Sequence, residues 1–230
     1  MYKIGIKDLA PKGEAKRIFQ NEKCLLGVSV SNPLYQSPEK LEYLFKWLAN
    51  NFDNVQIIIG DYLNRINENI NFGKQGEEAV LKSLYIGELL HSQIEIELKK
   101  YPSGKFSIIH WKDFLDNNPK HKDILNTLQN HLLTNPLFRE SIETTAKTFI
   151  AKNIKKGNIY LSENLALEKS IQYILEEMAV FSLFIEDGYI LQVYPGTTLT
   201  ILKELANNKH TDIDTNLCNG VYIDLTIKKN

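Results

Sequence analysis

Cys24-Leu-Leu-Gly-Val-Ser-Val30 is a continuous apolar run of strand length, and Ser31-Asn32-Pro33 ends it. A second run of the same kind follows at Val55-Gln-Ile-Ile-Ile-Gly60. Between the two runs, Pro38 can open a helix in which apolar residues recur at helical spacing as far as Asn50. Strands that are apolar on both faces are typical of buried parallel sheets, so this region predicts a βαβ crossover.

The rest of the chain continues the alternation of strands and helices. Further strands are expected at Phe106 to Trp111, Tyr189 to Tyr194 and Val221 to Ile227, and further helices at Gly76 to Lys100, Lys120 to Leu133, Pro136 to Ile154, Ser162 to Phe184 and Thr198 to Ala206. Residues 1–22 are expected to form an N-terminal arm with a short edge strand at Tyr2 to Ile6. The sequence therefore predicts one α/β domain over residues 1–230. Its mostly parallel, Rossmann-like sheet would be flanked by helices.

Composition narrows the class of protein further. The two cysteines, Cys24 and Cys218, have neither the number nor the spacing of a disulfide framework or a zinc site, and no segment resembles a signal peptide. No apolar run approaches the roughly 20 residues of a membrane-spanning helix. We therefore expect a soluble cytoplasmic protein without a metal.

The net charge of −1 argues against indiscriminate coating of nucleic acid, although a local patch could still bind phosphates.

Ligands of parallel α/β sheets bind outside the carboxyl ends of the strands, so the residues to inspect are Ser29 to Asn32, Asp61, His110 and Tyr194. Ser29 is a candidate nucleophile, and Ser31 is a less favoured one. The alternative is a strand-end serine that only hydrogen-bonds the next loop. The segment lacks the second glycine of a G-x-S-x-G elbow, which argues against an α/β-hydrolase.

Tyr173 and Glu177 are four residues apart on a predicted helix and so share one face. A phenol beside a carboxylate could bind a substrate ammonium group. The alternative is a half-buried tyrosine beside a solvated Glu176-Glu177 pair. The five histidines show no metal-ligand spacing, and no glycine-rich phosphate loop follows a strand, so no nucleotide cofactor is expected.

Three segments taken together resemble the cyclodipeptide synthases in order and spacing. They are Leu25 to Asn32, Tyr173 to Phe181, and Val193-Tyr194-Pro195, and the resemblance extends from about residue 23 to 205. It implies a fold similar to the catalytic domains of class I tyrosyl- and tryptophanyl-tRNA synthetases. No HIGH-like or KMSKS-like ATP signature is present here, which agrees with the missing nucleotide loop and with an enzyme that uses no cofactor.

The resemblance also implies roles for individual residues. Ser29 would be the nucleophile that receives the first aminoacyl group, Tyr173 and Glu177 would hold the amino group of that residue, and Tyr194 would line the same site. Leu25 and Gly27 would lie where the first amino-acid pocket is lined.

The same resemblance bears on the subfamily. The Tyr194-Pro195 pair is similar to the subfamily that has Tyr-Pro here, whereas Asn32, assigned to substrate binding, is common in the other subfamily. Many members have Glu-Leu-Pro where this chain has Glu177-Met178-Ala179.

The implied substrates are two aminoacyl-tRNAs, joined by a ping-pong reaction through an aminoacyl-serine enzyme. The family's basic tRNA-binding helix is replaced here by a helix from Gly76 that is rich in glutamate. Five lysines are therefore expected to share the binding of tRNA: Lys99, Lys100, Lys152, Lys155 and Lys156. The alternative functions are a non-catalytic tRNA-binding module and, third, a serine hydrolase.

Overall fold

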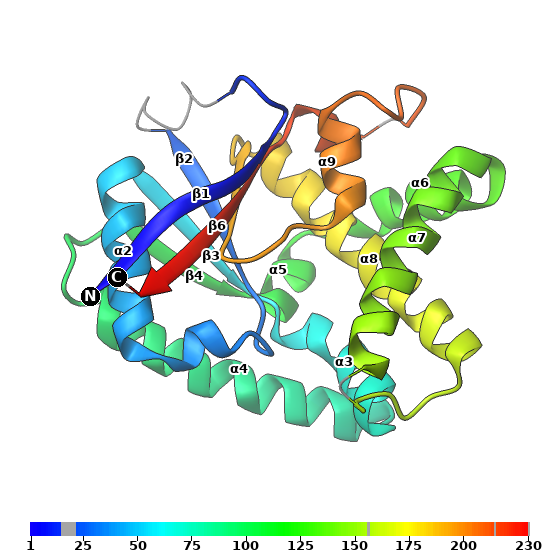
Figure 1. The fold of residues 1–230 in the computed structure, drawn as a ribbon, viewed down its shortest axis with the longest axis horizontal. Coiled ribbons are helices and arrows are strands. Elements are labelled where there is room, and N and C mark those ends of the chain that lie inside the picture. The colour runs from blue at the N-terminus through cyan, green and yellow to red at the C-terminus, as the bar shows by residue number, and fades with distance from the viewer. Residues whose placement is uncertain (15–21, 156, 214, 230) are drawn as a thin grey trace.

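A six-stranded sheet forms the centre of the computed structural model, which describes residues 1–14, 22–155, 157–213 and 215–229 (Figure 1). The strands are β1 (Tyr2–Ala10), β2 (Lys23–Val28), β3 (Asn54–Ile59), β4 (Phe106–His110), β5 (Leu191–Tyr194) and β6 (Val221–Lys229). Their order across the sheet is β1-β6-β5-β2-β3-β4. Only β1 and β6 pair antiparallel among these strands, so the predicted mostly parallel sheet is confirmed.

Helices cover both faces of the sheet (Figure 1). One face packs against α2 (Pro38–Asn51) and α4 (Gly76–Leu98). The other face packs against α3 (Asp61–Phe72), α5 (Trp111–Asn117), α6 (His121–Thr134), α7 (Pro136–Ile154), α8 (Glu163–Glu186) and α9 (Thr200–Ala206). Two short 3-10 turns lie at Pro33–Gln36 and Asn216–Asn219. The fold is thus a three-layer α/β arrangement.

Burial on both faces explains why β2 reads as a continuous apolar run. Leu26 and Val28 pack with α2 and α4, whereas Leu25 packs in the core on the α8 side. Gly27 points to the α8 side too, where an added Cβ would meet the rings of Phe181 and Tyr194 at 3.7 and 4.0 Å. Alternate residues of the strand therefore belong to two different cores.

Two helices were not predicted, α3 and α5. In α3 the asparagines, which are poor formers of helix interiors, mask a short apolar stripe of Leu63, Ile66 and Ile70 that is buried against the core. The strand expected at Phe106 to Trp111 ends at His110, because Trp111 begins α5.

The predicted ends of the strands also differ from the observed ones. β2 ends at Val28, two residues before the predicted end. The edge strand expected at Tyr2 to Ile6 is present and continues to Ala10, paired along β6 from Tyr2 with Lys229 to Ala10 with Tyr222. Residues 15–21 of the predicted arm lie outside the described residues.

The direction of the chain through the sheet reverses between β2 and β5. From β2 the chain moves outward through β3 to β4, and from β5 it moves the other way to β6. Because β2 and β5 are neighbours, their carboxyl ends border the point where the connections diverge. Open α/β sheets bind their ligands at such a point. Ser29 and Tyr194 are the side chains found there.

Candidate active site

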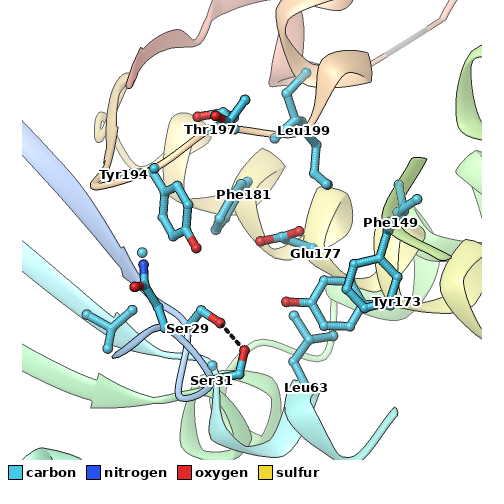
Figure 2. Close-up of a pocket in the computed structure, with 18 of the residues that line it drawn as sticks. Ser29, Ser31, Leu63, Phe149, Tyr173, Glu177, Phe181, Tyr194, Thr197 and Leu199 are labelled. Carbon is cyan, nitrogen blue, oxygen red and sulfur yellow. Dashed lines mark hydrogen bonds between the residues drawn. The ribbon is translucent and has the colours of Figure 1, made fainter. Parts of the chain in front are cut away.

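A cavity of about 540 Å³ opens at the carboxyl ends of β2 and β5. Its wall is built by the strand ends, by one face each of α3, α7 and α8, and by the loop that leads into α9. We call it the strand-end cavity. Ser29, Tyr173, Glu177 and Tyr194, which the sequence predicted as one site, all line it, and Figure 2 shows their polar ends pointing into the same space.

Ser29 directly follows β2 and is partly exposed to the cavity. Its Oγ lies 3.1 Å from the Oγ of Ser31 (Figure 2), and its carbonyl accepts a hydrogen bond from the backbone of Asn32. Asn32 in turn donates its side-chain amide to the carbonyl of Pro195 at 3.2 Å. The tight turn after β2 is therefore tied to the end of β5, which fixes the serine beside Tyr194.

Glu177 is the carboxylate of the strand-end cavity. Helical spacing places Ser170, Tyr173, Ile174 and Glu177 on the one face of α8 that lines the cavity. The Oε2 of Glu177 is buried and has no hydrogen-bond partner in the described structure. Burial raises the pKa of this carboxyl from 4.5 to about 8. A neutral carboxyl without a partner is ready to accept a cationic ligand, which would lower its pKa again.

The two tyrosines of the cavity remain protonated phenols. Burial, followed by the neighbouring Glu177, raises the pKa of Tyr173 well above 10. Burial also raises the pKa of Tyr194, although hydrogen bonds with Asn32 and Ser29 act in the opposite direction. Both phenols can therefore donate hydrogen bonds to a substrate oxygen.

Glu176 faces away from the cavity and is anchored. Arg65 on α3 donates two hydrogen bonds to its carboxylate, at 2.9 and 2.7 Å, and the indole of Trp111 donates a third at 3.3 Å. Glu176 is thus buried and hydrogen-bonded, and Glu177 lines the cavity with its Oε2 buried, so the alternative of a solvated Glu176-Glu177 pair is wrong.

The other predicted site residues are distributed more widely. Gly27 and Asn32 line the cavity, whereas Leu25 is fully buried in the core and is not part of the wall. Among the lysines expected to bind tRNA, Lys152 lines the cavity and Lys155 follows the last residue of α7. Lys99 and Lys100 follow the end of α4, and Lys156 lies outside the described residues.

The sequence did not predict that α3 lines the cavity, nor that Ser170 on α8 and three further residues on α7 do. Thr145, Phe149 and Asn153, spaced four residues apart on α7, line the wall, as does Ser170. The Oγ of Ser170 and the Nδ2 of Asn153 are buried without a partner. The four-residue spacing was the available signal, but it does not say which face of a helix meets a cavity.

Two of the five histidines, His91 and His110, form a cluster with Asp61 away from the cavity. The Nδ1 of His110 lies 2.6 Å from Asp61, and its Nε2 lies 2.7 Å from the Nδ1 of His91. Within the described residues no histidine lines the strand-end cavity, and no group of three or more His, Cys, Asp and Glu side chains could hold a metal ion. The histidines therefore offer no general base for Ser29. Nor is any helix in the described part of the chain long and apolar enough to span a membrane.

Comparison with known proteins identifies the family of the chain. A sequence model of the cyclodipeptide synthase family matches residues 11–200. The chain belongs to the cyclodipeptide synthase family. The resemblance seen in the three segments is thus confirmed at the level of the family. A search of the curated proteins gives no match.

Solved structures of cyclodipeptide synthases share the fold. One from Fluoribacter dumoffii is similar over 100% of both chains, with a TM-score of 0.81 and 21% identity. A protein from Mycobacterium tuberculosis, whose structure was described as relating cyclodipeptide synthetases to type I tRNA synthetases, covers 100% of this chain and 94% of its own, with a TM-score of 0.73 and 15% identity.

A third neighbour was solved with a ligand. The cyclodipeptide synthase from Candidatus Glomeribacter gigasporarum was solved bound to Phe-tRNAPhe. It is similar over 97% of this chain and 94% of its own, with a TM-score of 0.65 and 13% identity. At these identities the likeness shows the fold, and the fold is that of cyclodipeptide synthases.

Proposed function

We propose that this chain joins the aminoacyl groups of two aminoacyl-tRNAs into a diketopiperazine through an ester on Ser29. One observation carries the proposal: a serine hydroxyl, a phenol and an unpartnered carboxyl face one another in the strand-end cavity. The aminoacyl ester of a charged tRNA is already activated, so the protein needs to position groups and stabilise charge rather than consume ATP.

In the first step the Oγ of Ser29 attacks the carbonyl carbon of the aminoacyl ester. A new ester bond forms to Ser29, the bond to the ribose oxygen breaks, and the serine proton ends on that ribose oxygen. Within the described structure no histidine lines the cavity, so we assign this proton transfer to the substrate's own amine or ribose. Ser31, at 3.1 Å, can hold the serine hydroxyl in place.

Glu177 and Tyr173 would hold the amino group of the bound residue. When an ammonium group enters, the carboxyl of Glu177 loses its proton and forms a charge-assisted hydrogen bond. The phenol of Tyr173 can accept a second hydrogen bond from the same ammonium, or donate to an ester oxygen. The free carboxyl gains a partner only when substrate binds, which favours the aminoacyl group over water.

The second half of the reaction forms two amide bonds. The freed amine of the residue on Ser29 attacks the ester of a second aminoacyl-tRNA, which releases that tRNA and leaves a dipeptide on Ser29. The terminal amine of the dipeptide then attacks the ester on Ser29. The ring leaves and the hydroxyl of Ser29 is restored. We assign the relay of the proton to Tyr173, because it lines the same cavity.

Two finer assignments belong to the same proposal. We assign the chain to the Tyr-Pro subfamily on the strength of Tyr194-Pro195, even though Asn32 is present, because here Asn32 hydrogen-bonds the carbonyl of Pro195. For tRNA we favour Lys152 and Lys155, because Lys152 lines the cavity and Lys155 lies three residues further along the chain.

The test is mass spectrometry of the medium of a bacterial culture that expresses the chain. We expect new cyclic dipeptides from the wild type and from Ser31→Ala, and none from Ser29→Ala. Products from none of these cultures, with folded protein present, would favour the non-catalytic tRNA-binding module. Hydrolysis of simple esters without tRNA would instead support the serine hydrolase.

A further inference from the structure

The outer face of α4 carries an exposed apolar stripe. Leu81, Tyr85, Leu89 and Ile96 are each 55–66% exposed. Together with Ser92 they fall within an arc of about 80° around the helix and extend about 22 Å along it. We call these five residues the α4 stripe. Four large apolar side chains in one exposed line are more than the scattered apolar residues of an ordinary surface.

The inner face of α4 is already committed to the core. Leu90 and Ile94 are buried against the sheet, and Gly87 lies so close to α3 that an added Cβ would be 2.4 Å from the Cβ of Asp61. The helix therefore cannot roll to bury the α4 stripe. Figure 1 shows α4 along the lower edge of the molecule, with its outer side uncovered by the other labelled elements.

Charge is distributed unequally between the two ends of α4. Glu77 and Glu78 lie at its first turn, and Lys99 and Lys100 follow its last residue, all four of them exposed. Glu78 already contacts Lys74 at 3.7 Å, and Lys100 contacts Glu97 at 2.8 Å. An acidic end and a basic end flank the apolar stripe.

From this pattern we infer that the α4 stripe is the contact surface of a homodimer, in which α4 pairs antiparallel with α4 of a second copy. A two-fold axis between Glu88 and Leu89 places Leu81 level with Ile96 of the second copy, and Tyr85 level with Ser92. The same axis brings the acidic end of each helix to the basic end of the other. Parallel pairing would oppose like charges at both ends.

The charge of the surface also distinguishes the second copy from a nucleic acid. Besides Glu77 and Glu78, the exposed residues Glu88 and Glu95 flank the α4 stripe, whereas Lys82 lies beside Tyr85. A polyanion would be repelled along most of this face. Glu88, near the two-fold axis, lies 3.8 Å from the Nε2 of His110 in its own chain.

The contact would be modest in size and reversible. A single helix face is smaller than a standard interface of roughly 1,600 Å². We therefore expect dissociation on the order of 10 μM. No residue of α4 is found among the described residues that line the strand-end cavity, so the dimer would leave the cavity open. The inference does not depend on the proposed reaction.

Sedimentation of the full chain across a concentration series tests the apolar part of the contact. We expect a monomer–dimer equilibrium that Leu89→Glu weakens at least tenfold, because the residue occurs twice near the axis. Leu133→Glu, an equally drastic change at an exposed leucine of α6, should leave the equilibrium unchanged. A wild type that is monomeric at roughly 100 μM, or a dimer that Leu89→Glu leaves intact, overturns the inference.

A charge exchange tests the antiparallel direction. Glu77→Lys and Lys99→Glu, made in separate proteins, should each weaken self-association about tenfold at low salt, because the exchange cancels the charge of one of the two groups that meet at each end of the dimer. An equimolar mixture of the two variants should associate more tightly than either alone. Equal association in all three samples contradicts the antiparallel pairing. Weaker binding of a charged tRNA by a monomeric Leu89→Glu chain would assign the surface to tRNA instead.

Discussion

Glu176 and Glu177 are neighbours on α8, yet the two sides of the helix that they face are built differently. Arg65 and Trp111 satisfy the carboxylate of Glu176. The Oε2 of Glu177 has no partner, and burial raises its pKa to about 8. Successive residues of a helix point about 100° apart, so Glu176 faces its partners while Glu177 faces the cavity. The anchored side holds the helix in place, and the unpartnered side is free to bind.

Breaking the anchored side should have the largest effect. Glu176→Ala leaves the guanidinium of Arg65 partly buried without its partner, so we expect a loss of about 3 kcal/mol in the free energy of unfolding. Urea unfolding of the variant and of the wild type measures this difference in free energy. Glu143→Ala, which breaks an exposed ion pair with Lys147, serves as the control and should cost less than about 0.5 kcal/mol. Equal losses in the two variants would show that Glu176 is not an anchor.

Removing the charge on the cavity side should affect the reaction rather than the fold. Glu177→Gln keeps the shape of the side chain but cannot ionise, so we expect formation of the aminoacyl enzyme to slow about a hundredfold. Rapid quenching of the protein mixed with a charged tRNA measures this rate. Retention of the wild-type rate would mean that Glu177 does not hold the ammonium group.

The pKa of Glu177 sharpens the comparison through the dependence of stability on pH. A carboxyl whose pKa is higher in the folded protein contributes stability below pH 4.5, and this contribution is lost as pH rises through about 8. Relative to Glu177→Gln, the wild type should therefore lose stability between pH 5 and pH 9. The loss should be on the order of 2 kcal/mol, because the side chain of Glu177 is only partly buried and solvent screening lowers the cost of its charge. Parallel curves of unfolding free energy for the two proteins would contradict the raised pKa.

The smallest effect is expected at the phenol beside Glu177. Tyr173→Phe keeps the ring on the cavity wall and removes only the hydroxyl. We expect the aminoacyl enzyme to form, and ring closure to slow about tenfold. Chromatography follows the dipeptide and ring products over time, and the rate of ring formation in the variant is compared with the rate in the wild type. A variant with wild-type ring closure would remove Tyr173 from the proton relay.

Most of the sheet and the outline of the site could be predicted from local sequence. β2 and β3 are short apolar runs with turn residues after them, and α8 is a long apolar helix, so each pattern is complete within its own segment. Ser29 and Tyr194 follow from the rule that ligands bind at strand ends.

The rest depends on packing that no local pattern records. The two glutamates of α8 look alike in the sequence, and what separates them is the contact of Glu176 with Arg65 and Trp111, which are 111 and 65 residues away. The α7 wall of the cavity, with Thr145 and Phe149, needs the position of that helix against α8. The resemblance implies that Leu25 lines the pocket, but Leu25 lies two residues further from the carboxyl end of β2 than Gly27 and is buried in the core on the same face.

The central claim is that Ser29 carries the first aminoacyl group, and peptide mass spectrometry tests it most directly. The chain is mixed with one charged tRNA, quenched in acid and digested. We predict one added aminoacyl residue on the peptide that contains Ser29, in the wild type and in Ser31→Ala, and none in Ser29→Ala. An adduct that persists in Ser29→Ala, or one that disappears only in Ser31→Ala, would contradict the account.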